Sequence, residues 1–241
     1  MPDKKPLLSV VLPCRNQGDY IEGVLESWLP ALSSTGISFE MVVVPNACTD
    51  STPEAARKAA VRHPEIHVVE NPRGGWGLSV MTGLRAARGE ILCYTNSART
   101  NPAVISPLLA LYQANAPCLA KVSRVNRGAP LREAGSALFN MEARRFFGVG
   151  VSDVNGTPKM FPRSLFENVT LESDGDLLDL ELMALVRRMG IAVVEHQVEG
   201  FVRHGGTSST NWKTALRMFA GSWALYRRLN DPRRPSVPGR E

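Results

Sequence analysis

Short apolar runs that end in polar loops recur along the first hundred residues. Residues 7–12 are rich in Val and Leu, and residues 39–44, 66–69 and 91–94 form similar runs. Runs of this length without polar alternation are typical of strands that are covered on both faces. The pattern therefore predicts four buried strands.

Helical periodicity fills the segments between these strands. Residues 20–32 carry apolar side chains at helical spacing, Pro53 stands where the first turn of a helix tolerates proline, and residues 78–87 form another helical segment. Strands that alternate with helices imply a parallel sheet with right-handed crossovers. We therefore expect an α/β fold, with a mostly parallel Rossmann-like sheet flanked by helices.

The second half of the chain continues this alternation less regularly. A loop is expected at residues 124–135, which are rich in Arg, Gly and Pro. The other elements expected are helices over residues 102–114, 137–147, 177–189 and 211–229, strands over 118–122 and 191–198, and a short strand or turn over 158–161.

Composition narrows the class of protein. With 241 residues, 44% of them hydrophobic, the chain can bury a large core as one domain with an elaborated end. No apolar run approaches the roughly 18 residues that a membrane-spanning helix needs. The run at residues 7–12 is also too short for a signal peptide, so we expect a cytoplasmic protein. Four scattered cysteines without a CxxC pair indicate reduced thiols rather than a zinc site or disulfides: Cys14, Cys48, Cys93 and Cys118.

The positive charge is concentrated at the end of the chain. The formal net charge is +5, and residues 203–241 alone carry eight basic and two acidic side chains. An anionic surface or ligand near this end is the expectation. The final helix combines apolar and basic residues, which suits an interfacial helix on anionic lipid and equally a helix packed on its own domain. We divide the chain into a domain at 1–210, an amphipathic helix at 211–230 and a disordered tail at 231–241.

Small polar residues follow the fourth predicted strand. Thr95, Asn96 and Ser97 come directly after the apolar run that ends at Tyr94. In an open α/β sheet, ligands bind at the carboxyl ends of the parallel strands. These three residues are therefore the candidate centre of an active site. None is a carboxylate, so a hard divalent cation has no obvious anchor among them.

Several motifs, in a fixed order, carry a resemblance to a known family. Residues 9–17 read Ser-Val-Val-Leu-Pro-Cys-Arg-Asn-Gln, residues 43–52 read Val-Val-Pro-Asn-Ala-Cys-Thr-Asp-Ser-Thr, and residues 75–90 run from Gly-Trp-Gly to Arg-Gly-Glu. Later landmarks lie at residues 123–124, 151–154, 159–161, 179–182 and 203–208. Together they resemble family 2 glycosyltransferases of the GT-A fold, in particular the dolichyl-phosphate mannose synthase branch, over residues 8–209.

This resemblance implies sugar transfer from a nucleotide-activated donor, with inversion by direct displacement. It also implies a donor site at the carboxyl ends of the strands. The residues that match the donor-binding positions are Pro13, Arg15, Gln17, Val44, Asn46, Gly75, Thr95, Asn96 and Ser97.

The chain departs from the family pattern at its acidic positions. The metal-binding DxD motif aligns with residues 95–97, Pro45 and Asn46 stand where two aspartates are usual, and Gln17 replaces a glutamate. No metal ligand is assigned, and Mg²⁺ or Mn²⁺ as cofactor lacks its usual ligands. Joint loss of the acids is consistent with metal-free donor binding, in which Arg73, Arg99 or Arg127 offsets the diphosphate charge. Decay of the donor site explains the same loss. Because the Asn46 side chain can both donate and accept hydrogen bonds, recognition of a different base is a further alternative.

Acceptor-side positions are better preserved. Arg124, Arg132 with Ser136, and Arg203 with Ser208 match positions that contact phosphates in the lipid-phosphate branch. Guanidinium and hydroxyl donors both suit phosphate oxygens.

Carboxylates in the second half offer a general base. Asp179 is the first choice and Asp174 the second, because transfer to a hydroxyl needs a base within hydrogen-bond reach. Asp179 also lies near a helix start, where negative charge favours the helix dipole. Transfer to a lipid phosphate needs no base, because that acceptor is already ionised.

The leading hypothesis is a family 2 glycosyltransferase that acts on a nucleotide-sugar donor and a polyprenyl-phosphate acceptor at the inner membrane face. The C-terminal helix would provide the peripheral membrane contact, and no nucleic acid is expected as a partner. The rival is a non-catalytic GT-A-like binding or regulatory module. A nucleotidyltransferase is disfavoured, because the chain lacks the glycine-rich, basic N-terminal signature of sugar-nucleotide pyrophosphorylases.

Overall fold

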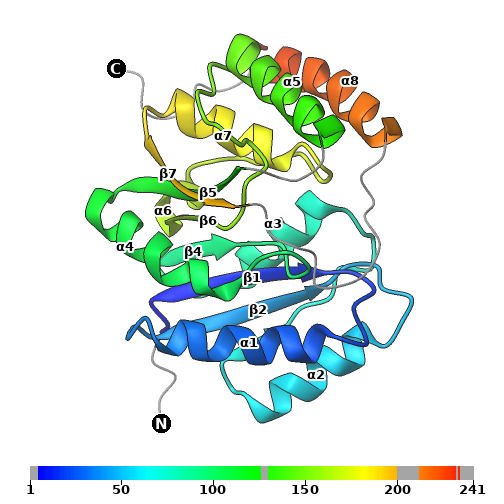
Figure 1. The fold of residues 1–241 in the computed structure, drawn as a ribbon, viewed down its shortest axis with the longest axis vertical. Coiled ribbons are helices and arrows are strands. Elements are labelled where there is room, and N and C mark those ends of the chain that lie inside the picture. Colours follow the sequence, from blue (N-terminus) through cyan, green and yellow to red (C-terminus); the bar gives the residue numbers. More distant parts are fainter. Residues whose placement is uncertain (1–4, 126–129, 200–211, 232, 234–241) are drawn as a thin grey trace.

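The computed structural model describes residues 5–125, 130–199, 212–231 and 233. Its strands form one seven-stranded sheet in the order β3-β2-β1-β4-β6-β5-β7 (Figure 1). All neighbours pair in parallel except β6, which is antiparallel to both β4 and β5. The α/β fold with a mostly parallel, helix-flanked sheet is thereby confirmed.

Strands and helices alternate through the first half as predicted. The central strands are buried along their whole length, which explains their unbroken apolar runs. The elements are β1 (Leu8–Cys14), α1 (Ile21–Ser33), β2 (Phe39–Pro45), α2 (Thr52–Arg62), β3 (Ile66–Val68), α3 (Trp76–Ala86) and β4 (Ile91–Tyr94).

The second half adds the antiparallel strand and the outer helices. Its elements are η1 (Pro102–Val104), α4 (Ile105–Asn115), β5 (Cys118–Val125), α5 (Pro130–Phe147), β6 (Lys159–Pro162), α6 (Arg163–Glu167), α7 (Leu178–Arg188), β7 (Ala192–Glu199) and α8 (Trp212–Leu229).

Two hydrophobic cores fill the space on the two faces of the sheet. One packs α1, α2 and α4 against the sheet around Trp28, Ile105 and Met160. The other packs α3 and α7 with the inner sides of α5 and α8, around Leu84, Phe161 and Leu225. Because Leu225 and Leu229 of α8 belong to this second core, the last described helix packs on the same body as the sheet (Figure 1).

One loop prediction is wrong. Residues 124–135 were expected to form a loop, but β5 continues to Val125 and α5 already begins at Pro130. Proline is well tolerated at the first position of a helix, where its missing N–H costs no hydrogen bond, so this proline opens the helix. The short helix α6 was not predicted, because five residues are too few to show helical periodicity.

Candidate functional site

Neutral polar groups line the carboxyl ends of β1, β2 and β4. We call this region the neutral edge and define it by residues 13–17, 44–46 and 95–97. The register brings its strands together, since Pro13 pairs with Val44 on one side and Val11 pairs with Tyr94 on the other. The structure therefore brings together the predicted donor-binding residues of three separate sequence motifs.

Ser97 ties the first motif to the third. Its hydroxyl lies 2.9 Å from the carbonyl oxygen of Pro13 and 3.0 Å from Oε1 of Gln17, and it is fully buried. The Gln17 backbone N–H in turn donates to Thr52 Oγ1 at 2.6 Å. Thr95 is also fully buried, and its hydroxyl bonds to that of Thr100 at 2.7 Å. These contacts fix the backbone that ends β1 and β4.

Asn46 extends the edge at the end of β2. Its backbone N–H donates to the Cys14 carbonyl at 2.8 Å, and the residue forms an isolated parallel bridge with Asn71. The Asn71 side-chain amide lies 3.4 Å from Asn46 Oδ1 and 2.8 Å from Ser79 Oγ. Asn46 is thus held on its carbonyl side, which orients its side chain at the edge.

The loops around the edge are shaped by Asp50. Its carboxylate accepts from Gly18 N at 2.8 Å and from Thr52 N at 3.1 Å and Thr52 Oγ1 at 2.5 Å. Burial opposes ionisation, but these hydrogen bonds outweigh it and lower the pKa of Asp50 below its ordinary value. Arg15 lies exposed on the loop between β1 and α1, which also carries Gly18.

Gly75 and Asp174 meet beside the edge. Gly75 has a φ of +109°, and a Cβ built on it would lie 2.5 Å from the Asp174 carbonyl oxygen. That same oxygen accepts from Leu78 N at 2.8 Å, which caps the start of α3. Glycine is needed here for both conformation and space. The Asp174 side chain is exposed, and its role as a base stays a prediction.

The neutral edge does not fit a tightly held divalent cation. Oδ1 of Asn96 accepts from Ala98 N at 2.9 Å, and the Ser97 hydroxyl is engaged by Pro13 and Gln17. Hard cations prefer anionic oxygens, and the edge offers amides and hydroxyls. Among residues 5–125, 130–199 and 212–231, no group of three or more His, Cys, Asp or Glu could hold a metal ion.

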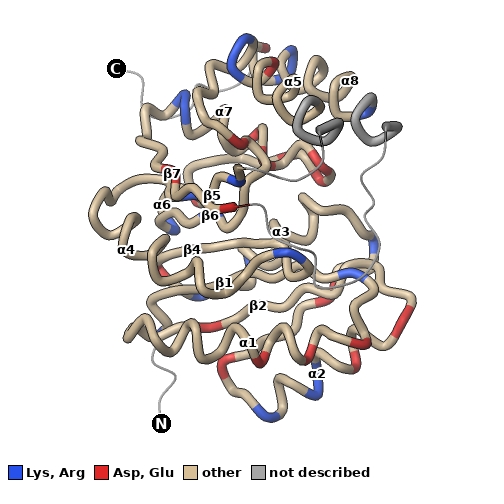
Figure 2. Tube along the Cα trace, in the orientation of Figure 1, with Lys and Arg blue, Asp and Glu red and all other residues tan. Residues whose placement is uncertain are grey.

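A second polar region lies within the other half of the sheet. We call it the charged network and define it by three cations and three carboxylates: Lys121, Arg124, Lys159, Asp153, Asp179 and Glu195. Lys159 on β6 pairs with Tyr94 on β4 and with Lys121 on β5, so these side chains share one level and one face of the sheet. Both lysines are fully buried. Charged positions inside this half of the sheet are also visible in Figure 2.

Asp179 lies at one end of the network. It forms an ion pair with Lys159, and it accepts from Tyr94 OH at 2.7 Å and from Trp76 Nε1 at 3.1 Å. Burial and the adjacent carboxylate raise the pKa of Tyr94 well above its ordinary value, so the phenol stays a hydrogen-bond donor. Asp179 therefore joins α7 to β4, β6 and the first turn of α3, and its role as a base stays a prediction.

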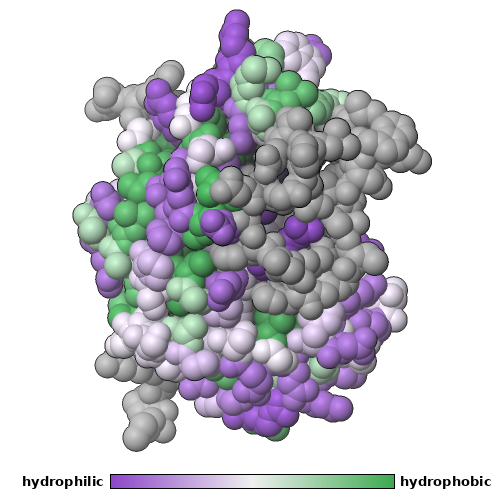
Figure 3. Space-filling model, in the orientation of Figure 1, coloured by the Kyte–Doolittle hydropathy of each residue, from purple (hydrophilic) through white to green (hydrophobic). Residues whose placement is uncertain are grey.

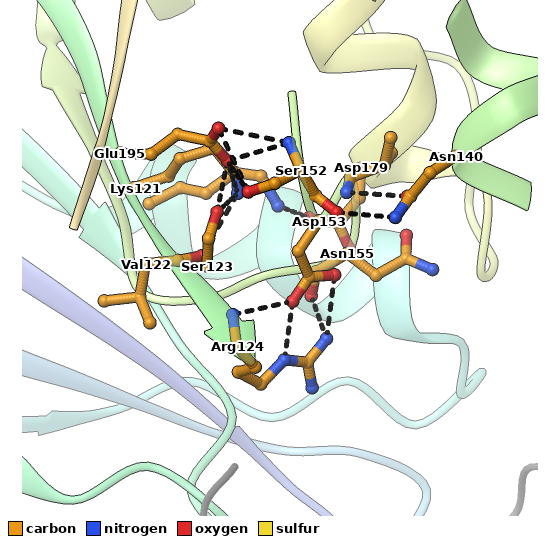
Figure 4. A network of polar contacts seen from close by, with 12 residues as sticks. Lys121, Val122, Ser123, Arg124, Asn140, Ser152, Asp153, Asn155, Asp179 and Glu195 are labelled. Carbon is orange, nitrogen blue, oxygen red and sulfur yellow. Dashed lines mark hydrogen bonds and ion pairs between the residues drawn. The ribbon is translucent and has the colours of Figure 1, made fainter. Parts of the chain in front are cut away.

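Arg124 is held at the other end. Its Nε donates to Asp153 Oδ2 at 2.8 Å, its Nη2 lies 3.3 Å from Oδ1, and Nη2 also reaches the Asn155 carbonyl at 3.1 Å (Figure 4). Lys121 on β5 and Tyr94 on β4 both pair with Lys159 on β6, so Arg124 lies beyond that level on β5, and residues 95–97 follow it on β4, with β6 between the two strands.

Lys121 and Glu195 complete the network. Lys121 Nζ contacts Glu195 Oε1 at 3.2 Å and Ser123 Oγ at 3.0 Å. Burial, together with the nearby charge of Lys159, lowers the pKa of Lys121 to about 8. The carboxylate of Glu195 also accepts from Ser152 N, which ties the loop before β6 to β7 (Figure 4).

The remaining predicted phosphate-site residues are only partly placed. Ser136 lies on α5, one helical turn after Arg132, whose side chain is outside the described part of the structure. Arg203 and Ser208 also lie outside the described residues, as does Arg127.

Sequence reasoning missed Lys121, Lys159, Glu195 and Trp76. A signal for the first two exists: each lysine interrupts or opens a strand that is otherwise apolar, at Cys-Leu-Ala-Lys-Val and Lys-Met-Phe. A lysine at a buried strand position needs a paired carboxylate. Only the register, however, shows that the two lysines face each other.

Comparison with curated proteins points to sugar transferases. The chain is 29% identical over 208 residues to glycosyltransferase AglD of Haloferax volcanii, covering 80% of this chain and 32% of that protein. It is 28% identical over 150 residues to undecaprenyl-phosphate 4-deoxy-4-formamido-L-arabinose transferase of Pectobacterium carotovorum, covering 61% of this chain and 46% of that protein. The chain thus spans about a third to a half of the length of these relatives.

A solved structure shares the fold. Glucosyl-3-phosphoglycerate synthase from Mycobacterium tuberculosis, in complex with Mn²⁺, UDP and phosphoglyceric acid, superposes with a TM-score of 0.74 at 20% identity, covering 92% of this chain and 78% of that one. The GT-A fold is confirmed by this likeness. The model of the family described as glycosyl transferase family 2 matches residues 9–170. Because that match covers more than half of the sequence, the chain belongs to glycosyl transferase family 2.

Proposed function

We propose that this protein transfers a sugar from a nucleotide-sugar donor to a polyprenyl-phosphate acceptor. One observation carries the proposal: the neutral edge assembles Gln17, Asn46 and Ser97 from three family motifs at the carboxyl ends of β1, β2 and β4, where ligands bind in such sheets. Family membership and relatives named as glycosyltransferases support sugar transfer. A relative named as an undecaprenyl-phosphate transferase supports the acceptor class.

The donor lies along the neutral edge in this proposal. Asn46 and Gln17 offer amide groups to the base and ribose, while the buried Pro13 and Val44 form the wall behind them. The loop of residues 95–97 faces the diphosphate with the partly exposed Asn96, held by the buried Thr95 and Ser97, and Gly75 leaves room for the backbone of the adjacent loop. Arg15, exposed on the first loop, adds positive charge beside the phosphates.

The acceptor phosphate approaches from the Arg124 side. Asp153 fixes Nε and Nη2 of Arg124, so the guanidinium is oriented before any ligand arrives. Arg132, Ser136, Arg203 and Ser208 are proposed to complete this phosphate site. An acceptor phosphate oxygen attacks the anomeric carbon, and the bond from that carbon to the donor phosphate breaks with its electron pair on the leaving nucleotide. The configuration inverts, and no proton must be removed from an ionised phosphate.

A base is needed only for a hydroxyl acceptor. Asp174, which is exposed beside Gly75, and Asp179 remain the candidates for that role. Both oxygens of Asp179 already accept hydrogen bonds, from Tyr94 and Trp76. This bonding suits a positioning role in transfer to a phosphate, which is the acceptor class we propose.

We propose that the protein itself holds no cation at the neutral edge. The solved structure of similar fold contains Mn²⁺, so a divalent cation is a plausible cofactor for this fold. The side chains at residues 95–97 are neutral and are engaged by Thr100, Pro13 and Ala98, which supports binding of the diphosphate by hydrogen-bond donors and arginines.

The protein is proposed to work in the cytoplasm at the inner face of the membrane, because a polyprenyl phosphate resides in a bilayer. Within the described residues, no helix is both long and apolar enough to cross a membrane.

Transfer is tested with radiolabelled nucleotide sugars and undecaprenyl phosphate in detergent micelles, followed by organic extraction. Radiolabel in the organic phase is expected with one donor and is expected to be lost in Arg124→Gln, because a neutral amide cannot offset the acceptor charge. Lys58→Gln on α2 serves as the control. Nucleotide binding without transfer to any acceptor would support the rival hypothesis of a binding module and contradict the proposal.

A further inference from the structure

The helix pair α5 and α8 lies at one end of the molecule, away from the sheet (Figure 1). The two helices run side by side and parallel, since Phe139 meets Phe219 with ring centroids 6.3 Å apart and Phe146 meets Tyr226 at 5.8 Å. Their inner sides bury Leu225 against the second core. Among the residues that the structure describes, the pair is thus anchored on its inner side.

The outer side of the pair is apolar as well. Helices that carry apolar residues on both sides are normally covered on both. In α2, at the opposite end of the molecule, Val61 is the single exposed large apolar side chain. On α5 and α8, by contrast, the exposed large apolar side chains form a group. They are Leu138 (48% exposed), Met141 (61%), Phe146 (40%) and Trp223 (53%).

These side chains surround a shallow groove. Its volume is about 400 Å³, and Figure 3 shows apolar surface over α5 and α8 beside hydrophilic side chains. The groove is lined by Leu138, Met141, Glu142, Arg145, Phe146 and Phe219. Trp223 stacks on Tyr226 and meets Phe146 at its edge, so the aromatic rim is held in place.

Basic side chains frame the apolar group. Arg144, Arg145 and Arg227 are exposed and lie in the last turns of the two helices. The guanidinium carbon of Arg145 lies 6.0 Å from the ring centre of Phe146, so charge and aromatic surface are adjacent. The sequence of α8 contains no acidic residue. Apart from Glu142 in the groove, this face thus complements an occupant that is both apolar and negatively charged.

We propose that the outer face of α5 and α8 docks on the surface of an anionic phospholipid bilayer. Aromatic and aliphatic side chains insert at the boundary between headgroups and acyl chains, and arginines pair with anionic headgroups. Trp223 is the anchor, because tryptophan favours this interface.

Docking here would bring the proposed active site to its acceptor. Arg124 lies near the end of β5, and α5 begins at Pro130, only a few residues further along the chain. Because α5 packs on the same body as the sheet, docking along it would hold the proposed active site at the bilayer that contains the lipid phosphate. This purpose rests on the proposed transfer to polyprenyl phosphate, whereas bilayer binding itself requires no sugar donor.

Co-sedimentation of the full chain with vesicles tests the inference. The vesicles contain phosphatidylcholine alone or with one third phosphatidylglycerol. Two double variants remove the two components separately: Met141→Ser with Trp223→Ser, and Arg144→Gln with Arg145→Gln. The matched control, Lys58→Gln with Val61→Ser, makes the same kinds of change on α2, where Val61 is 88% exposed. Thermal melting of each variant verifies folding.

Wild type and control are expected to bind the anionic vesicles alike. The two double variants on α5 and α8 are each expected to lose at least about tenfold in partition coefficient. Binding that is equal for all four proteins, or absent for wild type, would overturn the inference. A wild-type dimer in solution that Met141→Ser with Trp223→Ser converts to a monomer would identify the face as a contact between copies, and would overturn it too. Sugar transfer in detergent micelles would be unaffected by these failures, which separates this test from that of the proposed function.

Discussion

The neutral edge and the charged network are both buried and polar, but they are built from different chemistry. The neutral edge uses hydroxyls, amides and backbone groups, as in the contacts of Ser97 with Pro13 and Gln17. The charged network places two lysines at full burial and balances its three cations with three carboxylates. The side chains buried in the neutral edge carry no formal charge and its one charged residue, Arg15, is exposed, whereas the charged network reaches neutrality by pairing.

This difference separates a binding surface from a framework. Neutral donors and acceptors can receive a charged ligand without first breaking an ion pair. Buried ion pairs, by contrast, are costly to disturb, because removal of one partner strands the other. Arg124 is the one cation of the network that is partly accessible, with 22% of its side chain exposed, so positive charge reaches the site at that point.

The largest expected effect comes from breaking the network. Lys159→Met leaves the Asp179 carboxylate buried without its cation, so we expect a loss of about 3–5 kcal/mol in the free energy of unfolding. Urea denaturation measures it. The double variant Lys159→Met with Asp179→Asn should recover most of the loss, because no charge is stranded. A loss below about 1 kcal/mol in the single variant would show that the pair is not a framework element.

The second largest effect is expected from disturbing the close packing of Gly77 against the Ser173 backbone, beside the neutral edge. In Gly77→Ala the new Cβ would lie 2.2 Å from the Ser173 carbonyl oxygen, so we expect a loss of about 1–3 kcal/mol and weaker nucleotide binding as the loop shifts. Gly23→Ala is the matched control, since it also changes a first-turn glycine, in α1, and its Cβ meets nothing within 4 Å. Equal stability of the two variants in urea denaturation would contradict this packing.

The lowered pKa of Lys121 makes the free energy of unfolding depend on pH. The unfolded lysine holds its proton up to its ordinary pKa of 10.5, whereas the folded one releases it near 8, so this group makes stability rise with pH between those values. Relative to Lys121→Met, wild type should gain about 2 kcal/mol from pH 7.5 to 9.5.

The comparison with Lys121→Met is necessary because other groups act in the opposite direction. Burial raises the pKa of the Cys14 and Cys93 thiols, which lowers stability as pH rises, and it does so equally in both proteins. Parallel pH profiles of the two proteins would show that Lys121 keeps its proton in the folded state.

The smallest effect is expected from adding charge to the neutral edge. Asn96→Asp keeps an acceptor for the Ala98 N–H but places a carboxylate near the proposed diphosphate. We expect nucleotide affinity in EDTA to fall about fivefold through repulsion, about 1 kcal/mol, and Mn²⁺ to restore it. Calorimetric titration measures both. Unchanged affinity in EDTA would place the diphosphate elsewhere.

The sequence predicted the two regions unequally. The neutral edge was predicted well, because apolar runs that end in polar residues mark strand ends, and parallel strand ends meet at one edge. The charged network was not, because Lys121, Lys159 and Asp179 lie far apart in the chain and meet only through an antiparallel strand and its register. The sequence predicted Asp179 to lie near a helix start and to be a candidate base. It could not predict the hydrogen bonds of Asp179 with Tyr94 and Trp76, because they depend on tertiary packing. The roles of the predicted site residues and the division at residue 210 stay predictions.

The central claim is that the neutral edge binds a nucleotide diphosphate without a cation held by the protein. It is tested most directly by thermal denaturation with UDP, GDP, CDP and dTDP and their sugar conjugates, each in EDTA and in Mn²⁺ or Mg²⁺. The account predicts that one nucleotide raises the melting temperature equally in EDTA and in metal. Stabilisation that appears only with the metal, or none with any nucleotide, would contradict it.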